Sequence, residues 1–473
     1  MSENSFDLIV IGAGPGGYVA AIRAAQLGMR VAVVEKRATL GGTCLNVGCI
    51  PSKALLQSSH KYEEAKEHLS SHGVEVGNTV LNLEKMLARK DKVVKDLTGG
   101  IDFLFKKNKI TRLLGLGSFV NATTIAVTDD KGQSQQYSAG KILIATGSDV
   151  ISLPGIAIDE KNIVSSTGAL ALPSVPKHLA VIGGGYIGLE MATVWRRLGA
   201  QVTVIEYLDR ITPTMDQEVA KTLQKILVKM GIDFRLSTKL VSATKQSSKN
   251  KTTVTLTLEP ASGGAREEME ADVVLVAVGR KPNVAGLGLD KINLALDERG
   301  RIPVDDHFQT PVPNVYAIGD VIRGPMLAHK AEEEGIACVE MIAGQKPHVN
   351  YDCIPAVIYT HPEVASVGKT EEELKAANVP YKTGKFPFSA NSRARANDDT
   401  QGFVKILEHA ESGKIIGAHI IGPDAGTLIA EIALAIEFGG SAEDIYRTCH
   451  AHPTLNEAVK EAALAVDGHA IHV

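Results

Sequence analysis

A glycine-rich turn between a strand and a helix constrains the fold of this chain more than any other feature of its sequence. The apolar run Phe6–Ile11 leads into Gly12, Gly14 and Gly17, and a helix of small residues and a second strand ending in Glu35 follow. This order of strand, GxGxxG turn, helix, strand and acid is typical of a βαβ unit that binds a dinucleotide. The alternative is a tight turn in an unrelated α/β sheet.

The same pattern recurs in the middle of the chain. The offset is 171 positions throughout. It separates Gly12 from Gly183, Gly14 from Gly185, Gly17 from Gly188 and Glu35 from Glu206. A helix N-terminus behind such a turn offers free N–H groups to a pyrophosphate, and the acid accepts hydrogen bonds from ribose hydroxyls. The repeat therefore predicts two dinucleotide-binding domains and two dinucleotides. Because an acid repels a 2′-phosphate, Glu206 favours NAD over NADP at the second site.

The composition excludes several other classes of protein. The 473 residues carry a formal net charge of −4 and only 4% aromatic residues, which argues against a general nucleic-acid binder. No apolar run approaches the roughly 20 residues that a membrane-spanning helix needs. The N-terminal sequence shows no secretion signal, and five cysteines do not make a disulfide-stapled scaffold. We therefore expect a cytoplasmic protein that binds neither nucleic acid nor a membrane.

Two of the cysteines, Cys44 and Cys49, stand close together in GGTCLNVGCIPSK (residues 41–53). Residues five apart in a regular helix cannot be bridged, so the segment has to bend, and Gly48 and Pro51 allow that. In a reducing compartment such a pair is catalytic or metal-binding, and no second close pair completes a metal site. We interpret it as a redox-active disulfide, with a thiol whose pKa is lowered by a helix start and by the lysine that follows.

The remaining segments indicate how the domains are completed. Alternating stretches between Leu240 and Val278 predict an antiparallel β-meander within the second unit. Asp320 follows the strand NVYAIG, at the carboxyl end where α/β sheets bind ligands. From about Asn350, short strands followed by helices predict an α+β domain, and the acidic run 371–373 is interpreted as a solvated helix face.

Near the C-terminus, the segment CHAHPTLNE carries a second candidate for chemistry. Histidine is the side chain suited to proton transfer near neutral pH, and Glu457 can accept a hydrogen bond from His452. The spacing of Thr454 and Glu457 also fits a capping box, which would make the glutamate purely structural. Cys449 and His450 beside His452 could suggest metal ligands, although their spacing does not favour that. On the residues alone, catalysis by His452 and a structural role are equally open.

Together, the cysteine segment, the two GxGxxG units, the AIGD strand and HAHPTLNE resemble the pyridine nucleotide–disulfide oxidoreductase family over essentially the whole chain. Within it, the chain is similar to the flavoproteins that oxidise protein-bound dihydrolipoamide in 2-oxo acid dehydrogenase and glycine cleavage complexes. The resemblance implies FAD on the first unit, NAD on the second, and a homodimer. It also implies the lipoyl domain and the acyltransferase core of such a complex as partners.

The resemblance implies an α/β fold with two Rossmann-like dinucleotide-binding domains and a C-terminal α+β dimerisation domain. The expected order is an FAD-binding domain at 1–150, an NAD-binding domain at 151–280, a central domain at 281–349 that completes the FAD site, and an interface domain at 350–473.

The resemblance also assigns roles to individual residues, with Lys53 near the flavin and paired with Glu190. His452 would act on the disulfide of the other subunit, and no metal is implied. The catalytic residues would be Cys44, Cys49, His452, Glu457, Lys53 and Glu190. Contacts to FAD would come from Gly12, Gly14, Gly17, Glu35, Lys36, Gly42, Thr43, Lys53, Gly117, Thr146, Gly147, Ser148, Asp320, Met326, Leu327, Ala328 and His329. Contacts to NAD would come from Gly183, Gly185, Gly188, Glu190, Glu206, Leu240 and Gly279.

Two other functions remain as alternatives. A glutathione-reductase-like or mercuric-reductase-like enzyme would share the disulfide, but Glu206 argues against NADPH and the C-terminal tail has no cysteine. A flavin-bearing structural subunit without turnover is less consistent with an intact cysteine pair and His452.

Overall fold

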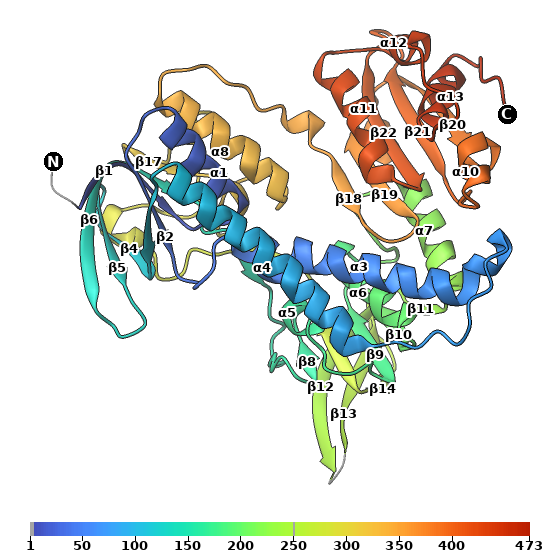
Figure 1. The fold of residues 1–473 in the computed structure, drawn as a ribbon, viewed down its shortest axis with the longest axis horizontal. Coiled ribbons are helices and arrows are strands. Elements are labelled where there is room, and N and C mark those ends of the chain that lie inside the picture. Colours follow the sequence, from blue (N-terminus) through green and yellow to red (C-terminus); the bar gives the residue numbers. More distant parts are fainter. Residues whose placement is uncertain (1–3, 249–250) are drawn as a thin grey trace. The chain divides into compact units, whose positions relative to one another are not determined.

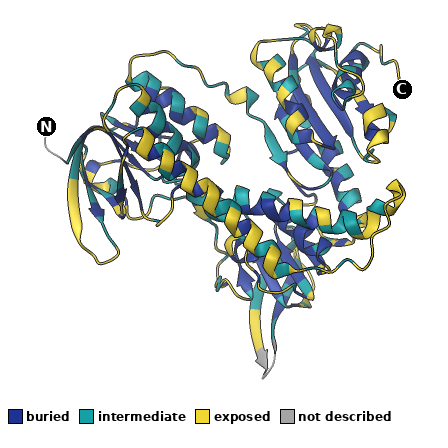
Figure 2. Cartoon of the chain, viewed as in Figure 1, coloured by how far each residue is buried: buried dark blue, intermediate teal, exposed yellow. Residues whose placement is uncertain are grey.

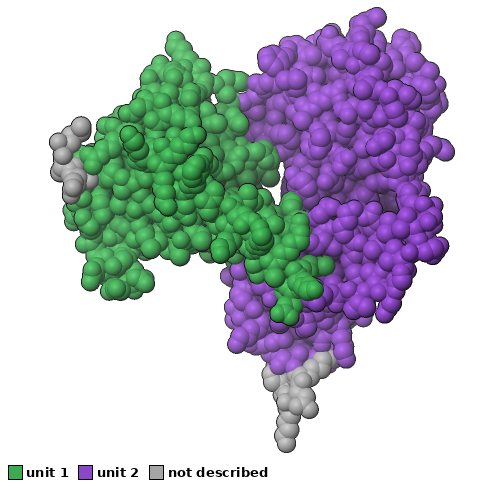
Figure 3. Space-filling model, viewed as in Figure 1, with its two compact units in different colours: residues 1–54, 84–151, 279–349 green, residues 55–83, 152–278, 350–473 purple. Residues whose placement is uncertain are grey.

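The computed structural model describes residues 4–248 and 251–473, and the chain divides into two units, which Figure 3 colours separately. Unit 1 comprises residues 1–54, 84–151 and 279–349. Unit 2 comprises residues 55–83, 152–278 and 350–473. The finer division into four domains stays a prediction.

Unit 1 is built on a sheet with a parallel centre. Its strands are β1 (Ser5–Ile11), β2 (Val31–Glu35), β3 (Thr111–Leu114), β4 (Leu116–Asn121), β5 (Thr124–Thr128), β6 (Ser134–Ile144) and β17 (Val315–Ala317). They run in the order β3-β2-β1-β6-β5-β4, and β17 also pairs with β6. The first half of β6 pairs antiparallel with β5, whereas its second half pairs parallel with β1 and β17 (Figure 1). The long strand β6 therefore joins a parallel dinucleotide-type sheet to a small antiparallel meander.

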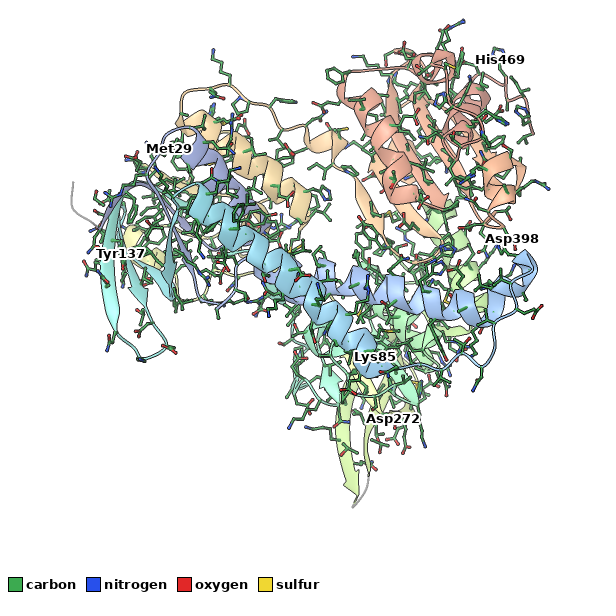
Figure 4. The ribbon with its side chains drawn as sticks, viewed as in Figure 1. Met29, Lys85, Tyr137, Asp272, Asp398 and His469 are labelled. Carbon is green, nitrogen blue, oxygen red and sulfur yellow. The ribbon has the colours of Figure 1, made fainter. Side chains whose placement is uncertain are left out.

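The core of unit 1 explains why these residues form parallel strands. All five positions of β2 are buried, and continuous apolar runs are what a sheet covered on both faces requires (Figure 2). Tyr137 of β6, labelled in Figure 4, has its ring centroid 6.4 Å from that of Phe6 on β1. Helices α1 (Pro15–Gln26) and α8 (Ala328–Ile342) pack so closely that only glycine fits at position 16. A Cβ at Gly16 would lie 2.7 Å from the carbonyl oxygen of Ala331. The unit also contains α2 (Gly42–Val47) and nearly all of α4 (Leu83–Lys107).

Two short strands form a ribbon, one just before residue 151, where unit 1 gives way to unit 2 along the chain, and one just after residue 279, where unit 1 resumes. It consists of β7 (Ser148–Val150) and β16 (Arg280–Pro282), which pair antiparallel within unit 1. The N–H of Ile151 donates to the carbonyl oxygen of Gly279 at 3.1 Å and extends the pairing.

Unit 2 contains a second parallel sheet, in the order β11-β10-β9-β15-β8. Its strands are β8 (Ile163–Val164), β9 (His178–Ile182), β10 (Gln201–Ile205), β11 (Ile232–Arg235) and β15 (Val273–Val276). The helices of this segment are α5 (Ser166–Ala169), α6 (Tyr186–Arg197) and α7 (Gln217–Lys229). As the alternating pattern predicts, β12 (Thr238–Ser248), β13 (Lys251–Pro260) and β14 (Glu267–Ala271) form an antiparallel meander.

The last part of unit 2 has the α+β organisation expected from Asn350 onward. Its antiparallel sheet, in the order β18-β19-β22-β21-β20, consists of β18 (Ala356–Ile358), β19 (Glu363–Gly368), β20 (Tyr381–Pro387), β21 (Phe403–His409) and β22 (Ile415–Gly422). Its helices are α9 (Glu371–Ala376), α10 (Ser392–Ala396), α11 (Ala425–Glu437), α12 (Ala442–Arg447) and α13 (Glu457–Val466). Gly384 lets β20 approach α13, because a Cβ there would lie 2.1 Å from the carbonyl oxygen of Ala462.

The interpretation of the acidic run 371–373 as a solvated helix face is wrong for Glu371 and Glu372, which are half-buried, whereas Glu373 is exposed. Glu371 accepts a hydrogen bond from the buried ammonium of Lys405 at 2.6 Å, and Glu372 accepts one from the backbone N–H of Gln217 at 3.3 Å. Glu373 accepts from the N–H of Thr370 at 2.8 Å and so caps α9. Two of these partners are distant in sequence, so the local charge pattern could not reveal them.

Among the residues that the structure describes, no helix combines the length and the apolar character that crossing a bilayer requires.

Candidate active site

The first glycine turn is so tight that only glycine fits at its key positions. Gly12 has φ +103°, and a Cβ there would lie 2.4 Å from the carbonyl oxygen of Ala145. A Cβ at Gly17 would lie 1.9 Å from the carbonyl oxygen of Gly12. No side chain caps the N-terminus of α1, whose N-cap is Gly14. The first N–H groups of this helix therefore form a cradle that suits a pyrophosphate.

Glu35 lies at the end of β2 and faces this turn. One carboxylate oxygen accepts from the N–H of Ala13 at 3.0 Å, and the other accepts from the N–H of Arg37 at 2.9 Å. Gly42 closes the opposite side, because a Cβ there would lie 2.5 Å from the Cα of Gly14. The residues of the first turn therefore fit the ADP half of a dinucleotide such as FAD.

The second glycine turn, in unit 2, has the same construction. Gly183 has φ +109°, and a Cβ there would lie 2.4 Å from the carbonyl oxygen of Ala277. A Cβ at Gly188 would lie 2.2 Å from the carbonyl oxygen of Gly183, and Gly185 is the N-cap of α6. Glu206 accepts from the N–H of Gly184 at 2.6 Å. The residues fit a second dinucleotide.

The surroundings of Glu206 bear on the choice between NAD and NADP. Its other carboxylate oxygen accepts from the N–H of Leu208 at 2.8 Å. Arg210, the basic residue that follows, donates to the carbonyl oxygen of Pro213 at 3.3 Å. A ribose bound at this turn would therefore meet a carboxylate, while this guanidinium is directed to a backbone oxygen.

The structure brings Ser148 and Asp320 together in unit 1. The hydroxyl of Ser148 donates to the carboxylate of Asp320 at 2.5 Å. The guanidinium of Arg280 donates to the hydroxyl of Ser148 at 2.7 Å and to its carbonyl oxygen at 2.6 Å. Arg280 therefore fixes the side chain that holds Asp320, a role that the sequence analysis missed.

Asn283 holds the loop that precedes Ser148. The hydroxyl of Thr146 donates to the carbonyl oxygen of Asn283 at 2.7 Å, and the N–H of Asn283 donates to the carbonyl oxygen of Gly147 at 2.9 Å. Asn283 was missed as well, although it follows Gly279 in the segment GRKPN, just past a strand end. The polar residues of this segment, directly after a strand, were the signal that could have identified Asn283.

The cysteine segment bends where the sequence indicated. Helix α2 ends at Gly48, and a Cβ there would lie 2.9 Å from the carbonyl oxygen of Thr43 and 3.2 Å from the Cα of Cys44. Helix α3 (Cys49–Glu63) then begins, with Pro51 in its first turn. The bend brings the side chains of Cys44 and Cys49 into hydrogen-bond contact, and both cysteines are thiols in this structure. Cys44 is half-buried and Cys49 is exposed.

A lowered thiol pKa was expected for one member of the pair, and Cys44 does not have it. The hydrogen bond to Cys49, burial and the negative charge of Cys49 raise the pKa of Cys44, and the nearby ammonium of Lys53 offsets this only in part. In a dithiol pair, the first thiolate opposes formation of the second. The effect of a helix start on one isolated thiol does not include this interaction between the two cysteines.

His452 and Glu457 form a hydrogen-bonded pair in unit 2. Nδ1 of His452 lies 2.9 Å from Oε1 of Glu457, and the N–H of Thr454 donates to Oε2 of Glu457 at 2.9 Å. Burial opposes ionisation of Glu457, but the Thr454 N–H and the His452 ring outweigh it and lower the pKa of Glu457. The hydroxyl of Thr454 donates to the carbonyl oxygen of Ala451 at 2.7 Å instead of capping α13. One carboxylate oxygen thus orders the turn and the other orients the imidazole.

Glu431 of α11 holds the loop that carries His452. Its carboxylate lies 2.6 Å from Nε2 of His450 and accepts from the side-chain amide of Asn456 at 2.8 Å. Nδ1 of His450 lies 2.9 Å from the carbonyl oxygen of Thr448, so both ring nitrogens are engaged. Glu431 was missed, although a charged residue within the apolar run TLIAEIALAI was a usable signal. Within the described residues, no three His, Cys, Asp or Glu side chains are arranged to hold a metal ion.

The other expected residues lie on several elements. Glu190 of α6 accepts from the N–H of Tyr359 at 3.1 Å within unit 2. Lys53 belongs to unit 1, so its pairing with Glu190 stays a prediction, as does a site that joins the cysteines to His452. Lys36 follows β2, Gly117 lies on β4, Leu240 lies on β12 and Gly279 precedes β16. Met326 and Leu327 precede α8, and Ala328 and His329 are its first two residues.

The chain is similar to known proteins over nearly its whole length. A family model described as pyridine nucleotide-disulphide oxidoreductase matches residues 6–335, and the model of its dimerisation domain matches residues 354–463. "Dihydrolipoyl dehydrogenase, mitochondrial" of Pisum sativum is 56% identical over 99% of this chain and 92% of that protein. "Leghemoglobin reductase" of Vigna unguiculata is 58% identical over 97% of this chain and 87% of that protein. The solved structure of LpdA from Mycobacterium tuberculosis gives a TM-score of 0.88 at 26% identity, covering 96% of this chain and 98% of that one.

These names contradict the expected cytoplasmic location. The pea relative is named mitochondrial, and further relatives carry the same word. The expectation was wrong because composition and the N-terminal pattern do not distinguish one reducing compartment from another.

Proposed function

Because the chain belongs to the pyridine nucleotide–disulphide oxidoreductase family, we propose that its two glycine turns, cysteine pair and histidine–glutamate pair act together as they would in a dihydrolipoyl dehydrogenase. The protein is a flavoprotein that uses FAD and NAD and oxidises protein-bound dihydrolipoamide with NAD⁺ as acceptor. The observation that carries the proposal is the contact between Cys44 and Cys49 across the Gly48 bend, in the unit that also carries the first glycine turn.

The residues of unit 1 fit FAD. Gly12, Gly14 and Gly17 would leave room for the pyrophosphate, Glu35 would accept from the ribose, and Asp320, held by Ser148, would accept from the flavin side chain. When bound, FAD supplies a two-electron acceptor that can be reoxidised by NAD⁺.

The cysteine pair performs the thiol–disulfide exchange. In the oxidised pair, a thiolate of the substrate attacks Sγ of Cys44, the bond between Cys44 and Cys49 breaks, and Cys49 leaves as a thiolate. The second substrate thiol loses its proton and attacks the substrate sulfur in the mixed disulfide, so that the bond from this sulfur to Sγ of Cys44 breaks and Cys44 leaves as a thiolate. A cyclic disulfide product is released, and two electrons remain on the cysteine pair. The pair becomes a disulfide again when these electrons are passed on towards NAD⁺.

The histidine–glutamate pair removes the protons of the substrate thiols. A thiol with a pKa near 8.5 is mostly protonated at neutral pH, so a positioned base accelerates the reaction. Because Nδ1 of His452 is bonded to Glu457, Nε2 is left to take the proton. The side chain of His452 is 70% exposed in the single chain, which lets it face a group outside that chain.

The match to a dimerisation domain at residues 354–463 supports a homodimer. We propose that His452 serves the cysteine pair of the other subunit, since His452 lies inside this matched region. The finer partners that we propose are the lipoyl domain and the acyltransferase core of a 2-oxo acid dehydrogenase complex. The four domains proposed above, at 1–150, 151–280, 281–349 and 350–473, provide the FAD site, the NAD site and the dimer interface.

A substrate panel tests this function. The purified protein is assayed with lipoamide, oxidised glutathione and oxidised thioredoxin, each with NADH and with NADPH. We expect lipoamide with NADH to give the highest kcat/KM. Faster turnover of glutathione with NADPH would favour the glutathione-reductase-like alternative, and no turnover with any pair would favour a structural subunit.

A further inference from the structure

Helix α8 of unit 1 buries an ion pair for which the reaction described above has no use. The ammonium of Lys330 and the carboxylate of Glu334 lie 3.0 Å apart, and both side chains are 0% exposed. Removing two charges from water is expensive, and apolar residues of similar volume are often at least as stable in such a place. The attraction between the two charges therefore does not by itself account for this pair.

Both side chains bind the same backbone residue, Gly319. The carboxylate of Glu334 accepts from the N–H of Gly319 at 2.8 Å, and the ammonium of Lys330 donates to its carbonyl oxygen at 3.1 Å. Gly319 has φ +76°, and a Cβ there would lie 3.2 Å from the Cβ of Ala331. An apolar pair would leave the buried N–H and C=O groups of Gly319 without these partners.

Gly319, which both side chains bind, lies directly before Asp320. Gly319 starts the short helix η4 (Gly319–Val321), and Ile318 and Val321 on either side are both fully buried. Once the backbone at Gly319 is fixed, the direction in which Asp320 leaves the chain is fixed as well. The carboxylate of Asp320 accepts from the hydroxyl of Ser148, which is itself bound by the guanidinium of Arg280. The backbone and the side chain of Asp320 thus have separate anchors.

We propose that Lys330 and Glu334 are positioning residues for the flavin site, which act by presenting the carboxylate of Asp320 to FAD. This inference rests on the proposed assignment of FAD to unit 1 and to Asp320. The two residues lie in the first two turns of α8, immediately after Met326–His329, so the ion pair also ties Asp320 to the helix start that is expected to meet the same ligand. The ion pair therefore makes the carboxylate of Asp320 and the start of α8 parts of one rigid site for FAD.

The test is FAD binding to apoprotein, measured by fluorescence titration, together with the melting temperature of the apoprotein. The variants are Lys330→Met, Asp320→Asn and the double variant, and the control is Glu333→Gln, an exposed carboxylate on the same helix. We expect Lys330→Met to weaken FAD binding about tenfold or more, as loss of a hydrogen bond from a charged group does. In the Asp320→Asn background, the same change should cost less than about twofold, because the two residues act through one another. Glu333→Gln should bind FAD as the wild type does.

Glu334→Gln provides a milder variant should Lys330→Met fail to fold. Its amide oxygen can still accept from the N–H of Gly319 but carries no charge, so we expect a folded apoprotein with weakened FAD binding. The inference is overturned if a folded variant of Lys330 or Glu334 binds FAD as tightly as the wild type, or if its loss adds in full to that of Asp320→Asn. If Asp320→Asn alone leaves FAD binding unchanged, the assignment of FAD to this carboxylate is overturned, and this inference with it.

Discussion

Replacing Glu457 with glutamine removes the negative charge beside His452 and keeps a side chain of the same shape. The amide oxygen of the glutamine can still accept from the N–H of Thr454, which donates to Glu457 at 2.9 Å. The turn should therefore persist while the electrostatic support of the imidazolium is lost. This change separates the chemical role of Glu457 from its capping role.

The size of the effect follows from the exposure of the pair. Opposite charges about 4 Å apart attract by roughly 1 kcal/mol in water and about 4 kcal/mol near a protein surface. His452 is 70% exposed in the single chain. An attraction of about 1–2 kcal/mol therefore applies, which corresponds to a 5- to 30-fold loss of turnover, taking about 1.4 kcal/mol per decade. His452→Gln removes the base itself and should lose about 10²- to 10⁴-fold.

The assay is dihydrolipoamide oxidation by NAD⁺, recorded as kcat/KM near neutral pH. Reduction of the flavin by NADH serves as the control and should be unchanged in both variants. A loss in Glu457→Gln as large as in His452→Gln would refute the charge argument.

Three further predictions concern the cysteines, the nucleotide and the pH dependence of stability. Cys44→Ser should abolish lipoamide turnover and show a long-wavelength absorption band from the Cys49 thiolate against oxidised flavin, whereas Cys49→Ser should lose turnover without the band; near-normal turnover in either variant would exclude the disulfide mechanism. Because Glu206 repels a 2′-phosphate by about 2–4 kcal/mol, NADH should exceed NADPH in kcat/KM by roughly 30- to 1000-fold, and comparable values would contradict this assignment. Burial, together with the positive neighbours His60 and Arg197, lowers the pKa of His361 to about 4. Unfolding lets this ring take up a proton below about pH 6.5, so stability should be lost as the pH falls from about 6.5 to 4. A plot of melting temperature against pH should be flatter for His361→Gln over that range, and an identical slope would contradict the assignment.

Local steric requirements made the two dinucleotide units predictable. Gly12 and Gly183 sit at positions where a Cβ would meet a carbonyl oxygen at 2.4 Å, so the glycine pattern reflects the tight turn directly. Glu35 and Glu206 end the strands that follow, and each accepts a backbone N–H from its own turn. These relationships span about one βαβ unit, a distance over which sequence spacing carries the geometry.

The residues that support the site from a distance could not be predicted in the same way. Arg280 reaches Ser148 across 132 positions, and, outside the site, Lys405 meets Asp216 across 189. Each was an ordinary charged residue in its own segment, and its partner became visible only when the sheets had formed. The raised pKa of Cys44 could not be predicted for a related reason, because its largest cause is the neighbouring Cys49.

Complementation between two inactive variants tests whether the cysteine pair and His452 belong to one reaction centre built from two subunits. Cys44→Ser and His452→Gln proteins carry different tags and are refolded together, and the doubly tagged dimer is isolated. Each parent dimer lacks one half of every centre, whereas the mixed dimer has one centre with both halves intact. We expect lipoamide turnover in the mixed dimer to approach half that of the wild type. A verified mixed dimer that stays as inactive as its parents would contradict the shared centre.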